Sequence, residues 1–376
     1  MLFEKIMFED LKIPQDLLPE DGRFGSGPTK VPVNFLEKLH LSGKNVLGNS
    51  HRNSTILDLV KRCRQKLKLY LNVPDDYEIL LGNGGASILW ETLAFSVVKE
   101  KSAHFTCGEF SSKWHSLTKA TTWLKTEKFD AEYGELPELK YSGDADLIAI
   151  THNETSTGVM IPKCPSFDSD ALLAVDATSI AGVVEWNFEK TDLYYFSLQK
   201  AFASEGGLFF AVASPRFIKR VEEVKKTGRY IPSMLSFDDI VSNSLKNQTL
   251  NTPSITTLFF LECSLDELLE KGLKNIQKTA EEKANFLYSF AENSKFLSPY
   301  VKKPELRSLS VATIDINEEI SADDLVKAFR KNGINDINSY RKLGKNQIRI
   351  GIFPFVSFND VKKLTECIDF SFKSIR

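Results

Sequence analysis

The stretch ALLAVDATSIAGVVEWNFEKTDLYYFSLQK, residues 171–200, contains the residues that decide the fold. Its apolar runs ALLAV (171–175) and LYYFS (193–197) have the length and the side chains of buried strands. Asp176 directly follows the first run, and Lys200 comes shortly after the second. Because the carboxyl ends of parallel strands share one edge of a sheet, we expect both charged groups to face a site there. The alternative is that Asp176 caps a turn and Lys200 is a solvated lysine.

Further short apolar runs alternate with helical patterns, which predicts an α/β fold with a mostly parallel sheet wrapped by helices. Only QKAFASEGG separates the run at 193–197 from the next one, too few residues for a helical crossover, so these two strands are expected to be antiparallel. A helix is expected from Ser54, behind a cap at Asn53 or Ser54. The further runs are YEILLG (77–82), SAHFT (102–106), DLIAIT (146–151) and GLFFAVA (207–213).

The last hundred residues have a different pattern, which indicates a second, smaller α+β domain. A strand at 308–316, a helix at 321–333, a strand at 346–353 and a final helix from Asn359 follow one another. One long helix at about 256–292 is expected to bridge the two domains. We therefore predict a large domain over 36–275, and a small domain formed by 276–376 with the N-terminal arm at 1–35.

Composition excludes several classes of protein. At 376 residues the chain is long enough for about two domains. Its 48 Lys and Arg against 50 Asp and Glu give a net charge of −2, so no basic field indicates nucleic acid or a membrane as a partner. Five scattered cysteines without a CxxC pair favour reduced thiols. With neither a signal peptide nor a long apolar run in the sequence, we expect a soluble cytoplasmic protein.

The stretch LLGNGGASILWETLAF (80–95) has the pattern of a strand, a Gly-Gly turn and a helix that begins near Ala86 or Ser87. Free N–H groups and partial positive charge at a helix N-terminus suit a phosphate, to which Ser87 adds a hydroxyl. An ordinary capped turn is the alternative.

The pair Asp176 and Lys200 suits a pyridoxal cofactor. Such a cofactor needs a lysine for a Schiff base and a carboxylate beside its pyridinium nitrogen. No metal site is expected, because His40, His104 and His115 are not clustered at metal-ligand spacing. The four tryptophans, Trp90 among them, are interpreted as packing residues.

The ordered set GNGGAS, HNETSTGV (152–159), VDATS (175–179), SLQKAFA (197–203) and NTP (251–253) resembles the class V aminotransferases of fold type I. Within them the chain is most similar to the phosphoserine aminotransferases, especially the branch found in actinobacteria. FGSGPTKVP (24–32) and GNSHRN (48–53) extend the resemblance over nearly the whole chain. It implies a mostly parallel seven-stranded sheet in the large domain and pyridoxal 5'-phosphate (PLP) as the cofactor.

The resemblance also implies a set of cofactor contacts. Lys200 would carry the cofactor and move the α-proton, and Asp176 would pair with the ring nitrogen. Phe110 stands where the family stacks a tryptophan on the ring, so a π-face is kept and an indole donor is lost. The remaining contacts would be Ala86, Ser87 and Gln199 to the cofactor phosphate, Thr155 to the ring hydroxyl, and Asn251 and Thr252 across a homodimer interface.

On the substrate side, the resemblance implies two cationic groups. Arg349 would bind the α-carboxylate, because a guanidinium pairs with a carboxylate through two hydrogen bonds. His51 and Arg52 would bind the substrate phosphate, and Ser26 would orient the substrate. The family also supplies a basic pair from the partner's small domain, for which Arg341 and Lys342 are candidates.

The expected reaction transfers an amino group between glutamate and 3-phosphohydroxypyruvate and yields phosphoserine and 2-oxoglutarate. Use of 4-phosphohydroxythreonine stays open. The alternative is another class V enzyme, such as an alanine/serine–glyoxylate aminotransferase, which needs no phosphate-binding pair. Gln199 argues against a cysteine desulfurase, which carries histidine before the lysine.

Overall fold

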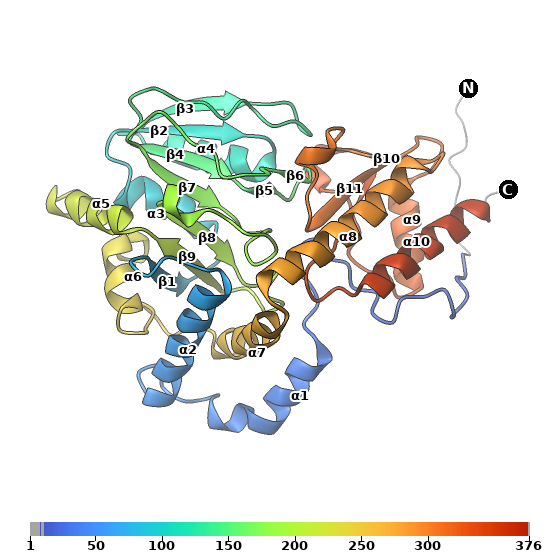
Figure 1. The fold of residues 1–376 in the computed structure, drawn as a ribbon, viewed down its shortest axis with the longest axis horizontal. Helices are drawn as coiled ribbons and strands as arrows, with labels where there is room; N and C mark the ends of the chain where they lie inside the picture. Colours follow the sequence, from blue (N-terminus) through green and yellow to red (C-terminus); the bar gives the residue numbers. More distant parts are fainter. Residues whose placement is uncertain (1–7, 9–10, 375–376) are drawn as a thin grey trace.

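The computed structural model describes residue 8 and residues 11–374, and its larger part is built on one seven-stranded sheet (Figure 1). Neighbouring strands from β8 to β3 are parallel, whereas β9 is antiparallel to both β8 and β1. The expected α/β fold, the mostly parallel sheet and the antiparallel pair are therefore confirmed. The strand order is β1 (Glu78–Asn83), β9 (Leu208–Ala213), β8 (Leu193–Ser197), β7 (Leu172–Asp176), β4 (Leu147–Thr151), β2 (Lys101–Thr106) and β3 (Lys125–Asp130).

Helices cover both faces of this sheet, which explains why the central strands are apolar throughout. In β7, Leu173 and Val175 point into one core and Leu172 and Ala174 into the other. α2 (Ser54–Tyr70) and α7 (Ile255–Lys271) contribute to the first core. The second core is shared with α3 (Ile88–Ser96), α4 (Glu109–Ala120), α5 (Pro215–Lys226) and α6 (Phe237–Ser244). Asn53 caps α2 as expected, by accepting a hydrogen bond from the Thr55 N–H.

Strand β3 is not found by the sequence analysis. Its sequence, KTEKFD, is only partly buried, and β2 is its single neighbour in the sheet. An edge strand of this kind needs no continuous apolar run, so periodicity does not reveal it. The strands β5 (Asn153–Glu154) and β6 (Val159–Met160) form a small hairpin. Each has only two residues, which is too short for a periodic pattern.

A second, three-stranded antiparallel sheet has the order β10 (Leu297–Pro299), β11 (Val311–Ile316) and β12 (Gln347–Gly351). Its core includes residues of α9 (Ala322–Lys331) and α10 (Phe358–Lys373), so the expected strand–helix–strand–helix order is confirmed and β10 is added to it. Besides α8, which is described below, the described residues also form α1 (Val33–Ser42) and the short 3₁₀ helices Gly43–Asn45, Phe188–Lys190, Ser233–Leu235, Pro304–Leu306 and Arg341–Leu343. None of the helices in the described part of the chain is long and apolar enough to cross a membrane.

The single bridging helix expected at 256–292 is wrong, because the chain forms two helices there. α7 ends at Lys271 and α8 (Leu273–Glu292) begins after Gly272, whose φ of +76° is incompatible with a continuous helix. α8 runs from the large sheet toward the small one (Figure 1). Ile276 belongs to the core of the large sheet and Leu287 to that of the small sheet.

Because α8 contributes to both cores, the division at 275/276 stays a prediction. Residues 1–7, 9–10 and 375–376 of the predicted small domain lie outside the described residues.

Replacing Gly272 by alanine should destabilise the protein by about 1–3 kcal/mol, because its positive φ is disfavoured for a residue with a Cβ. No heavy atom of the described residues lies within 4 Å of the added Cβ, so the cost is confined to the backbone. Gly206→Ala is the matched control, since its Cβ also meets open space without a positive φ. Thermal unfolding should show a lower midpoint for Gly272→Ala alone, and equal midpoints would contradict this explanation.

Candidate active site

Lys200 lies at the carboxyl edge of the large sheet, just after β8, in an enclosed position. Its side chain is buried, and its Nζ donates to Thr155 Oγ1 at 3.2 Å and to the Ser26 carbonyl at 3.1 Å. Gly27 (φ +128°) closes over the amine: a Cβ there would lie 2.5 Å from Lys200 Cε. The GSGP turn of the N-terminal arm therefore requires glycine at this position in order to contact the lysine.

The pKa of Lys200 is lowered to about 8, first because burial disfavours the charged amine and second because the Arg349 charge repels it. Asp176 and Glu154 act in the opposite direction. At neutral to mildly alkaline pH a substantial fraction of this amine is therefore unprotonated, which is the form that attacks a carbonyl carbon.

Asp176 ends β7, and its buried carboxylate accepts three hydrogen bonds. Oδ1 accepts from the Thr178 N–H at 3.0 Å and the Thr178 hydroxyl at 2.6 Å, and Oδ2 accepts from Trp90 Nε1 at 3.1 Å. Burial raises the pKa of Asp176, and these hydrogen bonds oppose the rise. Trp90 therefore orients the carboxylate in addition to packing, a role that sequence reasoning missed because nothing in the sequence pairs residues so far apart.

The Gly-Gly turn after β1 leads into α3 as predicted, with Ser87 at the N-cap position. The Ala86 N–H donates to the Ser197 hydroxyl at 2.6 Å, and the Ser87 side chain makes no capping hydrogen bond. Close by in sequence to Ser197, Gln199 has a buried Oε1 with no hydrogen-bond partner among the described residues. The uncapped start of α3 suits an anionic group of a bound molecule, and the buried amide of Gln199 lacks a hydrogen-bond partner for its Oε1.

Arg349 extends from β12 of the small sheet and contacts Thr155, the residue that also contacts Lys200. Its Nη1 donates to the Thr155 carbonyl at 2.9 Å, while Thr155 Oγ1 receives Lys200. Burial lowers the pKa of Arg349 to about 10, still high enough to keep it charged at neutral pH. Thr155 thus sets an amine and a guanidinium side by side.

A cavity of about 650 Å³ adjoins these groups. Among its lining residues are Ser26, Arg349 and the two candidate cations Arg341 and Lys342. The structure therefore brings this part of the expected substrate site together. Its further lining residues are Gly25, Gly27, Pro28, Arg330, Asp336, Asn338, Ser339 and Tyr340.

The Phe110 ring lies near the amine, with its centroid 6.0 Å from Lys200 Nζ. Glu154, which the sequence analysis did not single out, holds the start of helix α4 that carries Phe110. Its buried carboxylate accepts from the Phe110 N–H at 3.3 Å, the Ser111 N–H at 3.0 Å and the Ser156 hydroxyl at 2.7 Å. An acid flanked by small hydroxyl residues in NETST is the signal that could have found it.

The other four predicted residues lie elsewhere on the same chain, in an exposed patch formed by His51, Arg52, Asn251 and Thr252. His51 Nδ1 and Thr252 Oγ1 are 3.2 Å apart, and the side chain of Asn83 holds the 251–252 backbone at 3.1 Å. Within the described residues, no hydrogen bond or ion pair joins this patch to Lys200, Arg349 or Ser26.

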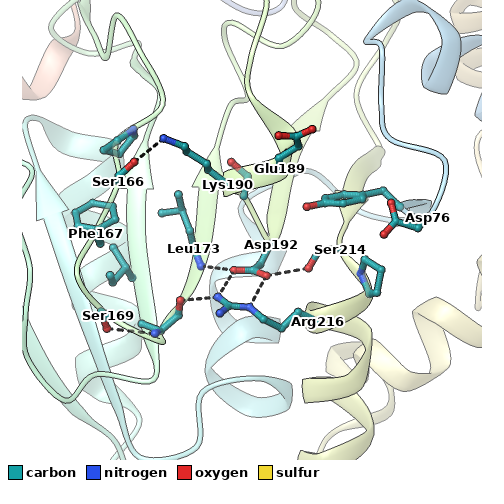
Figure 2. A pocket seen from close by; sticks show the side chains of 16 residues that line it. Asp76, Ser166, Phe167, Ser169, Leu173, Glu189, Lys190, Asp192, Ser214 and Arg216 are labelled. Carbon is teal, nitrogen blue, oxygen red and sulfur yellow. Dashed lines mark hydrogen bonds and ion pairs between the residues drawn. The ribbon is translucent and has the colours of Figure 1, made fainter.

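A second cavity, of about 540 Å³, lies at the opposite edge of the sheet, where the parallel strands begin (Figure 2). Its central carboxylate, Asp192, is already paired with Arg216 at 2.7 Å and accepts from the Ser214 hydroxyl and the Leu173 N–H. Figure 2 shows these groups turned toward one another. The polar groups of this cavity are thus already engaged with one another and serve to join the strands. The carboxyl edge of the sheet therefore remains the candidate active site.

Comparison with known proteins identifies clear relatives. The class V aminotransferase family model matches residues 24–364. A phosphoserine aminotransferase of Rhodococcus opacus is 44% identical over 360 residues, covering 95% of this chain and 96% of the relative. The crystal structure of a phosphoserine aminotransferase from Cytophaga hutchinsonii has a TM-score of 0.86 at 25% identity and covers 93% of this chain and 99% of its own. A PLP-bound phosphoserine aminotransferase from Trichomonas vaginalis shares the fold, with a TM-score of 0.81 at 21% identity over 93% of this chain and all (100%) of its own.

Replacing Arg349 by glutamine should raise the pKa of Lys200 above about 8, because the Arg349 charge is one of the two causes of its depression. The rate of reductive methylation of Lys200 in cofactor-free protein, followed by peptide mass spectrometry, should then reach its midpoint at higher pH. Arg330→Gln is the control, since Arg330 lines the same cavity but is not among the causes of the shift. A midpoint shared by all three proteins would contradict this assignment.

Proposed function

Since the chain belongs to the class V aminotransferases, we propose that it is a phosphoserine aminotransferase that uses PLP. It transfers the amino group of L-glutamate to 3-phosphohydroxypyruvate and yields O-phospho-L-serine and 2-oxoglutarate, a step of serine biosynthesis. The Rhodococcus relative supports this substrate pair. The observation that carries the proposal is the double contact of Thr155, whose hydroxyl receives Lys200 and whose carbonyl receives Arg349.

The residues present fit PLP at each of its functional groups. A buried lysine of lowered pKa stands ready for the aldehyde, and the Asp176 carboxylate can accept from a protonated ring nitrogen. Phe110 offers a ring face. Ala86 and Ser87 stand at the N-terminus of α3 for the phosphate, and the buried amide of Gln199 can turn its N–H₂ toward the same anion, since its two ends are nearly isosteric.

The chemistry of the site follows from what each residue holds. When bound, PLP supplies an aldehyde that takes up the amino group and a ring that withdraws electrons. Arg349 binds the α-carboxylate that both amino acids share, which explains how one site accepts both. The Lys200 amine would take the α-proton and return it, a task for which a pKa of about 8 is suited.

The phosphate of the substrate requires a second cation, which we assign to Arg52 with His51 from a second copy of the chain. Among the described residues of one chain, Arg52 is exposed, His51 is partly exposed, and neither has a hydrogen bond or ion pair to the Lys200 site. Met234, an exposed apolar side chain, contacts Asn251 of this patch, and Leu36, Leu41 and Tyr230 are also exposed. Such side chains are typical of a homodimer interface. A homodimer with shared sites would bring Arg52, His51, Asn251 and Thr252 to the partner's cavity.

An alanine/serine–glyoxylate aminotransferase, the alternative, would keep Lys200, Asp176 and Arg349 but would need no phosphate-binding pair. Arg52 therefore separates the two functions.

Replacing Arg52 by alanine should lower kcat/KM for phosphoserine by about 10- to 100-fold, because a charge-assisted contact to the phosphate is lost. The absorbance of bound PLP should stay unchanged, since Arg52 lies outside the cofactor contacts. Arg62→Ala, which removes another exposed arginine that is paired with Glu262, is the control. Unchanged phosphoserine turnover, or turnover of alanine in its place, would contradict the proposed function.

Mixing the inactive Lys200→Ala variant with the weakened Arg52→Ala variant tests the shared site. In a dimer of one Lys200→Ala chain and one Arg52→Ala chain, one of the two sites would combine intact Lys200 with intact Arg52. Random exchange of subunits should then restore about a quarter of the wild-type activity. If each site is built from a single chain, no mixture regains activity, and the homodimer with shared sites is refuted.

A further inference from the structure

Lys113 on α4 makes a contact that joins the two halves of the molecule and that the proposed chemistry does not use. Its Nζ donates to the Tyr340 hydroxyl at 2.9 Å. Tyr340 belongs to the segment 336–343, which precedes β12 and supplies several residues of the 650 Å³ cavity wall. The contact therefore ties the large sheet's helix α4 to the segment that leads to Arg349.

The Tyr340 ring lies between two groups of the candidate active site. Its centroid is 5.6 Å from that of Phe110, and the Arg349 guanidinium carbon lies 5.3 Å from the Tyr340 centroid. The Lys113 ammonium is 5.2 Å from the Phe110 centroid and 5.6 Å from that of Tyr340. Cation–π attraction therefore acts on Tyr340 from Arg349 and on Phe110 from Lys113, while Lys113 holds Tyr340 through the hydrogen bond to its hydroxyl.

The orientation of the Arg349 guanidinium depends on few contacts. Nη1 is held by the Thr155 carbonyl at 2.9 Å, whereas Nε reaches the Asn338 carbonyl only at 3.4 Å, a weak hydrogen bond. A single strong hydrogen bond lets the planar group turn about its axis. The face of Tyr340 supplies the contact that limits this rotation, and bidentate binding of a carboxylate requires a fixed plane.

We propose that Lys113 and Tyr340 are positioning residues that fix the Arg349 guanidinium for the α-carboxylate of the substrate. The inference rests on the proposed function for the identity of the substrates, and on the contacts above for the role itself. Lys342, whose Nζ is 3.8 Å from the Glu109 carboxylate, adds a second and longer link between the same segment and α4.

Two variants remove the contact without removing the rings. Tyr340→Phe deletes the hydroxyl and keeps the stacked face, and Lys113→Met deletes the ammonium and keeps an apolar chain of similar length. Each should raise KM for glutamate and for phosphoserine by the same factor, about five- to tenfold, with a smaller change in kcat. The factor is shared because both substrates present an α-carboxylate to Arg349.

The double variant and a rescue distinguish positioning from general damage. If both residues act through one hydrogen bond, Lys113→Met/Tyr340→Phe should raise KM no further than either single change. Lys113→Arg keeps a charged donor and should restore most of the affinity. Lys119→Met removes an exposed lysine from the last turn of the same helix and should leave both KM values unchanged.

Hydrogen exchange gives a readout that does not depend on turnover. Amides of the segment 336–343 should exchange faster in Lys113→Met and Tyr340→Phe than in the wild type, while those of β7 and β8 stay protected. Unchanged exchange together with unchanged KM would overturn the proposal. A KM that rises for phosphoserine alone would also overturn it, because Lys113 would then contact the substrate's distal anion directly.

The proposed function can fail separately. If the wild type accepts glutamate but not 3-phosphohydroxypyruvate, the substrate assignment is wrong, and the glutamate KM and the exchange data still decide on Lys113 and Tyr340.

Discussion

The double hydrogen bond at Thr155 is the interaction on which the rest of the site depends. Lys200 reaches it from the end of β8 in the large sheet, and Arg349 reaches it from β12 in the small sheet. Thr155 itself lies in the turn of the β5–β6 hairpin, directly after Glu154, which is buried and accepts hydrogen bonds from the first turn of α4. One short stretch, NETST, thus sets the relative position of the amine, the guanidinium and the Phe110 ring.

Close approach of two cations has an electrostatic cost, and the surrounding residues limit it. Glu154 and Asp176 oppose the effects of burial and of Arg349 on the pKa of Lys200, so the amine titrates near 8 and not lower. Asp176 in turn stays a good acceptor in an apolar setting because Thr178 and Trp90 donate to it. A buried carboxylate without such donors would take up a proton. It could then no longer accept a hydrogen bond as an anion from the protonated ring nitrogen of PLP.

The sequence predicts the parts of this design that leave a local pattern, and it misses those that depend on distant pairs. Apolar runs identify β7 and β8, and with them Asp176 and Lys200, because both faces of these strands are buried. The sequence analysis misses the edge strand β3, because a half-exposed strand has no apolar run. It also misses the helix break at Gly272, because lysine and leucine around the glycine continue a helical pattern. Trp90 and Tyr340 escape for another reason: their partners, Asp176 and Lys113, lie 86 and 227 positions away. The roles of the site residues remain proposals.

The repulsion between Arg349 and Lys200 also links substrate binding to the chemistry that follows. A carboxylate bound to Arg349 would offset its positive charge. The repulsion that helps to lower the pKa of Lys200 would then weaken, and this pKa would rise. The amine then becomes a stronger base at the moment when an amino acid with an α-proton is in place. In the cofactor-free protein the same amine is held closer to its neutral form, which is the one that attacks an aldehyde. Two cations on one threonine, which at first sight only destabilise the fold, therefore let the occupancy of the carboxylate position set the basicity of the lysine.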